Sequence, residues 1–179
     1  LGEGAGNIVL QSEKLLRKEP YCLLSGYSNV NEAFHQTGSS PEGNGPFWSM
    51  TEAIAKSEIL PEKIDYINVH GTGTLSNDLS EGLAIRRIFG DKIPPFSSVK
   101  AFIGHTLGAS EGIEAVYSVL SVYHGFIYPN LNFKEPIEEN MLMPETSFRE
   151  GLPIRNVLSN SFGFGGNDSS ILFSTLKEK

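Results

Sequence analysis

Cysteine is almost absent from this chain, since Cys22 is the only one among 179 residues. A single cysteine excludes an internal disulfide framework and predicts a reducing, cytoplasmic compartment. Cys22 lies in an apolar run without basic neighbours that would lower its pKa. We therefore interpret it as a buried structural thiol and not as a nucleophile.

An excess of basic residues and long apolar runs are also lacking. The chain has 14 Lys and Arg against 21 Asp and Glu, which gives a formal net charge of -7. Proteins that bind nucleic acid without regard to its sequence need a basic surface, so this class is excluded. No apolar run approaches the roughly 20 residues that a transmembrane helix needs. No signal-peptide pattern follows Leu1, and we expect the chain to be an excised piece of a longer protein.

Strand and helix patterns alternate along the chain. Strands are predicted over residues 21–27, 64–69, 96–99, 154–160 and 170–174, and helices over 47–60, 79–89 and 111–124. This alternation predicts one α/β domain over residues 1–179, with a mixed five-stranded sheet flanked by helices (α-β-α). Residues 1–6 indicate a glycine-rich turn that leads into a further strand at Ile8, Val9 and Leu10.

Chemically reactive side chains follow three of these strands. His70 precedes a turn made by Gly71 and Gly73, Lys100 and His105 follow the strand at 96–99, and a glycine-rich loop follows the strand at 154–160. Strand ends of an α/β sheet can converge on one edge, where such folds place their ligands. We therefore expect one shared site.

Two imidazoles and an ammonium suit chemistry at a thioester carbonyl. A neutral imidazole can donate a hydrogen bond to a carbonyl oxygen as negative charge develops there. An ammonium at Lys100 would disfavour protonation of a nearby imidazole. Asp78 and Glu81 share one face of the helix after His70, so one of these carboxylates can anchor Lys100.

A nucleophile is missing from this set of residues. The glycine-rich residues 163–166 can expose backbone N–H groups as an oxyanion hole, but none of them has a nucleophilic side chain. A zinc site made from His70, His105 and Asp78 is conceivable from residue types alone. The spacing typical of such sites is absent, however, and a neighbouring lysine would oppose a cation.

Three motifs stand in a fixed order along the chain. They are residues 70–74 (HGTGT) with Asp78 and Glu81, Lys100 with Gly104 and His105, and residues 160–166 (NSFGFGG). Together they resemble the carboxy-terminal half of an elongating β-ketoacyl-acyl carrier protein synthase. Residues 2–6 and 31–41 also resemble their counterparts, so the resemblance covers essentially the whole chain. It implies a thiolase-like fold of two similar halves, in which residues 1–20 are the tail end of the first half.

The resemblance also implies a reaction. In this family a cysteine of the first half takes an acyl group from the phosphopantetheine arm of acyl carrier protein, and malonyl-carrier protein is decarboxylated for a Claisen condensation. By similarity, His70 and His105 would bind the malonyl thioester carbonyl and stabilise the enolate. Lys100 would be held by Glu81, with Asp78 nearby.

Further roles follow from the same resemblance. Thr72 and Thr74 would touch the phosphopantetheine arm, and Phe164 would be the gating residue, with its N–H in the oxyanion hole. No permanently bound cofactor is implied. The implied partners are acyl carrier protein and the missing first half, in a parent homodimer or heterodimer. The family commonly has Thr-Asn where this chain has Asn167 and Asp168.

Two other readings of the parent protein stay open. It can be a non-catalytic partner that resembles a chain-length factor, although retention of both histidines and the lysine favours an enzyme. It can also be a thiolase or priming synthase that uses acyl-coenzyme A, but those families usually differ at the positions of His70 and Lys100. In each case the isolated chain is expected to be inactive, because the nucleophilic cysteine is absent.

Overall fold

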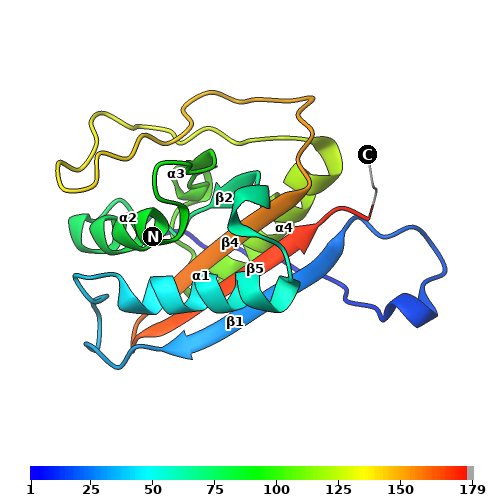
Figure 1. Ribbon diagram of the computed structural model, residues 1–179, viewed down its shortest axis with the longest axis horizontal. Coiled ribbons are helices and arrows are strands. Elements are labelled where there is room, and N and C mark those ends of the chain that lie inside the picture. The colour runs from blue at the N-terminus through cyan, green and yellow to red at the C-terminus, as the bar shows by residue number, and fades with distance from the viewer. Residues whose placement is uncertain (177–179) are drawn as a thin grey trace.

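A five-stranded mixed sheet forms the centre of the computed structural model, which describes residues 1–176 (Figure 1). The strand order is β1-β5-β4-β2-β3. The strands are β1 (Leu23–Asn31), β2 (Tyr66–Asn68), β3 (Phe96–Ser97), β4 (Asn156–Gly163) and β5 (Asn167–Ser174). β5 pairs antiparallel with both β1 and β4, whereas β2 pairs parallel with β3 and β4. The predicted fold class is confirmed.

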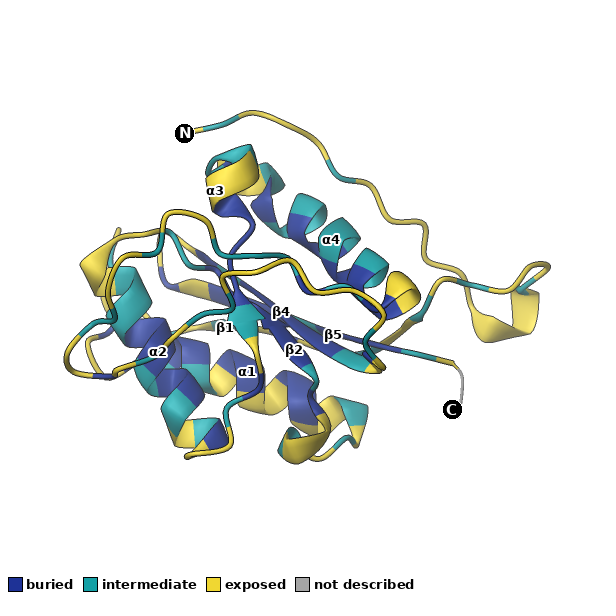
Figure 2. Ribbon diagram, turned by 90° about the horizontal axis from the view of Figure 1, so that it is seen from above, coloured by how far each residue is buried: buried dark blue, intermediate teal, exposed yellow. Residues whose placement is uncertain are grey.

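Helices cover both faces of this sheet and produce three layers (Figure 2). The helices are α1 (Asn44–Ser57), α2 (Leu75–Phe89), α3 (Lys100–Ile103) and α4 (Ser110–His124). Single 3-10 turns occur at Glu13–Leu15, Pro61–Lys63 and Leu107–Ala109. α1 and α2 pack on one face and α4 on the other. None of the helices formed by residues 1–176 is both long and apolar enough to cross a membrane.

The hydrophobic core has two parts, one on each face of the sheet. Successive strand residues point to opposite faces, so in β4 Leu158 packs toward α1 and α2 whereas Val157 packs toward α4. In β5, Leu172 likewise packs toward α1 and α2, whereas Phe173 packs toward α4. These four side chains are almost fully buried because both faces are covered.

The opening strand predicted at Ile8, Val9 and Leu10 is wrong. Residues 1–12 have no strand or helix, and Val9 is 93% exposed. The β-branched pattern is real, but no neighbouring strand lies beside this segment to share hydrogen bonds. It is instead attached near the site, where the Gly2 N–H donates to the His105 carbonyl at 2.9 Å.

Other differences concern element ends. β1 continues to Asn31 and α1 begins at Asn44, so the loop expected over 28–46 is shorter. β4 and β5 extend into the glycine-rich loop and leave only residues 164–166 as a turn. α3 was not predicted, because four residues are too few to show a helical period.

The two-sided core predicts a contrast between two leucines. Leu172→Ala, at a fully buried position, should lower the free energy of unfolding by about 2–5 kcal/mol through lost burial and a residual cavity. Leu60→Ala, at a position that is 58% exposed, should change it by about 0.5 kcal/mol or less. Urea denaturation of both variants measures the difference, and equal losses would contradict the burial assigned to Leu172.

Candidate active site

The turn between β2 and α2 places His70 inside the protein. Gly71 and Gly73 have φ values of 43° and 76°, which permit the sharp turn expected from the sequence. His70 itself is only 3% exposed. The two carboxylate oxygens of Glu81 accept the backbone N–H groups of His70 (3.0 Å) and Gly71 (2.9 Å). Glu81 therefore holds the turn that presents the imidazole.

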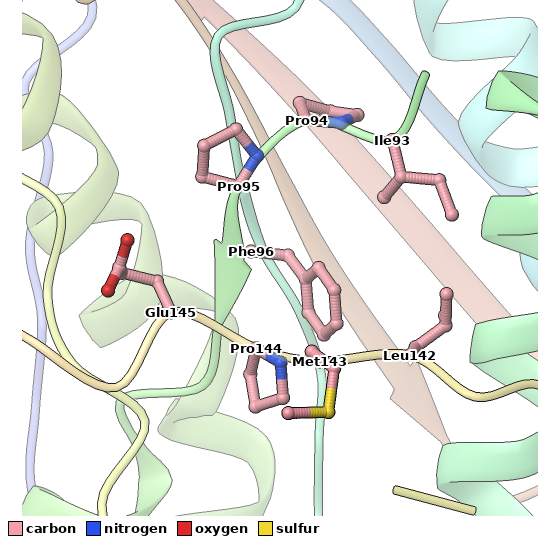
Figure 3. Close-up of a pocket in the computed structure, with 8 residues that line it drawn as sticks. All are labelled: Ile93, Pro94, Pro95, Phe96, Leu142, Met143, Pro144 and Glu145. Atoms are coloured by element: carbon pink, nitrogen blue, oxygen red, sulfur yellow. The ribbon is translucent and has the colours of Figure 1, made fainter. Parts of the chain in front are cut away.

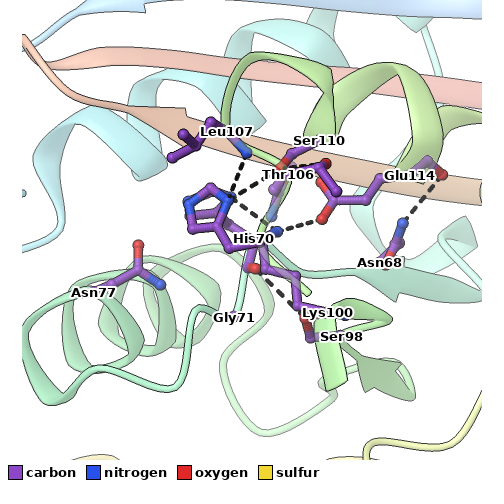
Figure 4. A network of polar contacts seen from close by, with 12 residues as sticks. Asn68, His70, Gly71, Asn77, Ser98, Lys100, Thr106, Leu107, Ser110 and Glu114 are labelled. Atoms are coloured by element: carbon purple, nitrogen blue, oxygen red, sulfur yellow. Dashed lines mark hydrogen bonds and ion pairs between the residues drawn. The ribbon is translucent and has the colours of Figure 1, made fainter. Parts of the chain in front are cut away.

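Glu81 does not hold Lys100, and that prediction is wrong. Lys100 forms an ion pair with Glu114 of α4, and its Nζ lies 3.2 Å from His70 Nδ1 (Figure 4). Glu81 is already occupied by the turn, and its Oε1 also accepts the side-chain N–H of Asn160 at 3.0 Å. α4 lies on the opposite face of the sheet from α2, so Lys100 is neutralised from the other side.

Glu114 was missed by sequence reasoning, although a signal was present. It stands in a mostly apolar helix, on the same face as Ser110 and Ser118, and all three are buried. A charged residue on a buried face needs a partner of opposite charge. Lys100, which was predicted to pair with Glu81, is that partner.

The hydrogen bonds define the tautomer of each imidazole. The backbone N–H of Leu107 donates to His105 Nδ1 at 3.2 Å, so this nitrogen carries no proton. The Lys100 ammonium can only donate, so His70 Nδ1 is likewise the acceptor. In both neutral rings the proton is therefore on Nε2. The rings lie 5.4 Å apart in an edge-to-face arrangement, which provides two neighbouring N–H donors.

Burial and charge keep these rings neutral. Burial, followed by the charges of Lys100 and His105, lowers the pKa of His70 from 6.5 to about 2. Burial and the Lys100 charge also lower the pKa of His105. Phe162 of β4 contributes to the enclosure, because its ring lies 5.6 Å from that of His70. Both imidazoles can donate a hydrogen bond at neutral pH.

A pocket of about 600 Å³ opens beside these groups. Thr72, Asp78, Glu81, Lys100 and His105 line its inner side, and residues 130–137 line its outer side. The structure thus brings most of the predicted site residues to one cavity. Burial raises the pKa of Asp78, although its Oδ1 accepts the Gly73 N–H at 3.3 Å.

Three predicted site residues, His70, Thr74 and Phe164, are not among the residues that line this pocket. The hydroxyls of Thr72 and Thr74 are 3.0 Å apart, and Thr74 is exposed. Phe164 stands on the turn between β4 and β5, and 72% of it is exposed. A side chain this free can move without disturbing the core.

A second hollow, of about 320 Å³, lies between residues 93–96 and 142–145 (Figure 3). Its lining is largely apolar and contains none of the predicted site residues. Among residues 1–176, no group of three or more His, Cys, Asp or Glu side chains is placed to hold a metal ion.

Cys22 has the properties of a structural thiol. It packs against the core cluster under α4, and burial raises the pKa of the thiol to about 11. Very little thiolate is present at neutral pH. The described residues thus offer a site that can stabilise an oxyanion, without a thiolate to attack.

The buried ion pair yields a first prediction for this site. Glu114→Ala leaves the Lys100 ammonium buried without its partner and should lower the free energy of unfolding by about 3–5 kcal/mol. Lys56→Ala, which removes an exposed ion pair with Glu52, should have a much smaller effect. Urea denaturation tests both variants, and losses of similar size would show that the Lys100–Glu114 pair is not buried as described.

The lowered pKa of His70 yields a second prediction. An NMR titration should show no protonation of this ring from about pH 8 down to about pH 5. The unfolded chain takes up a proton below 6.5 and the folded chain does not, so His70 should reduce stability as pH falls from 6.5 toward 2. A ring that titrates near 6.5 would contradict the assigned environment.

Comparisons with known proteins agree with this geometry. The family model "Beta-ketoacyl synthase, C-terminal domain" matches residues 21–134. The mitochondrial 3-oxoacyl-[acyl-carrier-protein] synthase of Arabidopsis thaliana is 37% identical over 98% of this chain and 40% of its own length. The 3-oxoacyl-[acyl-carrier-protein] synthase 2 of Staphylococcus aureus is 36% identical over 97% of this chain and 44% of its own length.

Solved structures show the same fold. A type II polyketide synthase complex of acyl-carrier protein with its ketosynthase, AntDE:AntF, superposes with a TM-score of 0.82 at 30% identity, over 87% of this chain and 39% of the other. The ishigamide ketosynthase/chain length factor superposes with a TM-score of 0.82 at 31% identity, over 88% of this chain and 38% of the other. The chain thus spans about two-fifths of the length of these relatives. It belongs to the β-ketoacyl synthase family, whose carboxy-terminal domain it carries.

Proposed function

We propose that this chain is the malonyl-activating part of a carrier-protein-dependent β-ketoacyl synthase. The observation that carries the proposal is the pair of neutral imidazoles, His70 and His105, each with its proton on Nε2. Two such donors stabilise an oxygen that gains negative charge, and they need no reorganisation when the charge develops.

The chemistry follows from these donors. When malonyl thioester loses carbon dioxide, the electrons of the broken C–C bond pass to the thioester carbonyl and form an enolate. Hydrogen bonds from His70 and His105 to its oxygen lower the barrier to this step. The enolate carbon then attacks an acyl thioester on a cysteine that the rest of the parent protein supplies, and the cysteine leaves as thiolate.

Lys100 supports this step without forming a bond to the substrate. Its ammonium donates to His70 Nδ1, which directs the proton of that ring to Nε2. Its charge also disfavours an imidazolium at both histidines. Glu114 holds Lys100 from α4, and Glu81 holds the turn that carries His70.

Substrate delivery is proposed by similarity. The phosphopantetheine arm of acyl carrier protein would pass Thr72 and Thr74 into the pocket, with Phe164 as a movable gate. The exposed positions of Thr74 and Phe164 support these roles. One structural neighbour is a ketosynthase in complex with its acyl-carrier protein. We propose a homodimeric or heterodimeric parent in a compartment that keeps thiols reduced, such as the cytoplasm.

A chain-length-factor-like partner is the second candidate. Complexes of a ketosynthase with a chain length factor are among the structural neighbours, so the fold suits both roles. The intact arrangement of His70, His105 and Lys100 favours the enzyme, because a partner without catalysis has no need of two aligned donors.

The test is condensation of malonyl- and acyl-carrier protein by the full-length parent. His105→Ala removes one donor and should lower the rate by about 100-fold or more. His124→Ala, at the exposed end of α4, should leave it unchanged. The isolated 179-residue chain should not condense. Equal rates for the parent and its His105→Ala variant would reject the proposed role, and no activity in the parent would favour the partner.

A further inference from the structure

Asp168 is an unusual residue in the buried part of β5. Only 1% of it is exposed, and among the described residues its Oδ2 has no hydrogen-bond partner. A buried carboxylate oxygen without a donor is costly when it is charged.

Glu32, which follows β1, lies beside Asp168. A Cβ on Gly45, at the start of α1, would overlap Asp168 Oδ2 and would lie 2.8 Å from Glu32 Oε2. Only glycine leaves room there for the two carboxyl groups. The Glu32 oxygens accept the N–H groups of Ser40 (2.9 Å) and Gly45 (3.0 Å), so both oxygens of this side chain have a donor. No such donor reaches Asp168 Oδ2 within residues 1–176.

The same residues connect two loops. Glu32 N–H donates to the Gly166 carbonyl at 2.9 Å, and Gly165 N–H donates to the Gln36 carbonyl at 2.8 Å. The Asn31 side chain donates to the Gly165 carbonyl at 2.9 Å. The turn at 164–166, which carries Phe164, is therefore closed on residues 31–36 and lies next to Glu32, since a Cβ on Gly166 would be 3.2 Å from Glu32 Cγ.

We propose that Glu32 and Asp168 hold one proton between them, and that this proton keeps the turn at 164–166 closed on residues 31–36. The proton resides on Asp168, whose O–H then points to the charged Glu32. Asp168 is thus a positioning residue for Phe164. When the proton is lost to solvent, the buried carboxylate of Asp168 and the half-buried carboxylate of Glu32 repel each other beside the contact between the two loops.

The surroundings of Glu32 and Asp168 support loss of the Asp168 proton near neutral pH. Burial, followed by the charges of Glu32 and Glu81, raises the pKa of Asp168 from 3.8 to about 7. The folded state holds the Asp168 proton more tightly than the unfolded chain does. The contribution of this proton to folding stability is therefore complete below pH 3.8 and is lost as the pH rises through about 7.

Nearby groups of positive character do not neutralise the pair. The N-terminus of α1 carries partial positive charge, but its Gly45 N–H already donates to Glu32. Arg87 of α2 reaches this end of α1, where it donates to the Glu42 carbonyl and the Asn44 side chain. His35, on the neighbouring loop, accepts the Thr37 N–H. On the neighbouring strands, the residues that pair with Asp168 are Phe162 of β4 and Val30 of β1, and neither is charged.

Amide hydrogen exchange, measured on the unmodified full-length protein and on variants of it, tests the proposal. After correction for the intrinsic pH dependence, protection of the amides at 163–167 should fall by about tenfold or more between about pH 6 and about pH 8. Asp168→Asn, whose amide donates to Glu32 at every pH, should keep the protection at both pH values. Asp91→Asn, an exposed change of equal charge, should behave as the unmodified protein does.

Two outcomes would overturn the shared proton. One is equal protection of the unmodified protein at both pH values, and the other is an equal loss in Asp168→Asn. Carboxyl carbon NMR of the unmodified protein is a second test that needs no variant, and Asp168 should titrate near neutral pH. Titration of Asp168 below about pH 5 would reject the proposal. Neither readout depends on condensation, so failure here leaves the proposed reaction untouched.

Discussion

Lys100 brings a positive charge into the interior, and the site is built around its neutralisation. Glu114 reaches Lys100 from α4, while His70 approaches from the turn after β2. One ammonium therefore ties together elements from both faces of the sheet. Its charge also keeps the two imidazoles neutral, so the interaction that holds the site in place sets its chemical state as well.

Three buried carboxyl groups are accommodated in three different ways. Glu114 pairs with the Lys100 ammonium and Glu81 accepts three N–H groups, whereas among residues 1–176 the Oδ2 of Asp168 has no hydrogen-bond donor. Burial raises the pKa of Glu81 to about 7 despite its hydrogen bonds. Burial also raises the pKa of Glu114 and of Asp168 to about 7, so all three carboxyl groups respond to pH near neutrality although their partners differ.

The glycine-rich turns separate rigid from movable parts of the site. The turn at His70 is fixed by Glu81, and Asn160 extends this support through Ser170 to Ser49 on α1. The turn at 164–166 is held by two backbone hydrogen bonds to residues 32 and 36 and by side-chain hydrogen bonds from Asn31 and Asn167. If the pocket takes a phosphopantetheine arm as proposed, a fixed donor site and a separate turn that can open would suit its entry and release.

The sequence by itself determined the fold class, the main strands and helices, and the convergence of His70, Lys100 and His105, because these depend on local periodicity and on strand ends that meet at one edge. Only the tertiary structure decided the partner of each buried charge. Asp78 and Glu81 share a helix face near His70, yet Lys100 pairs with Glu114 across the sheet. Likewise, Ile8, Val9 and Leu10 have a strand pattern but no neighbouring strand. Pairing depends on which groups meet across the core, and spacing along the chain does not contain that information.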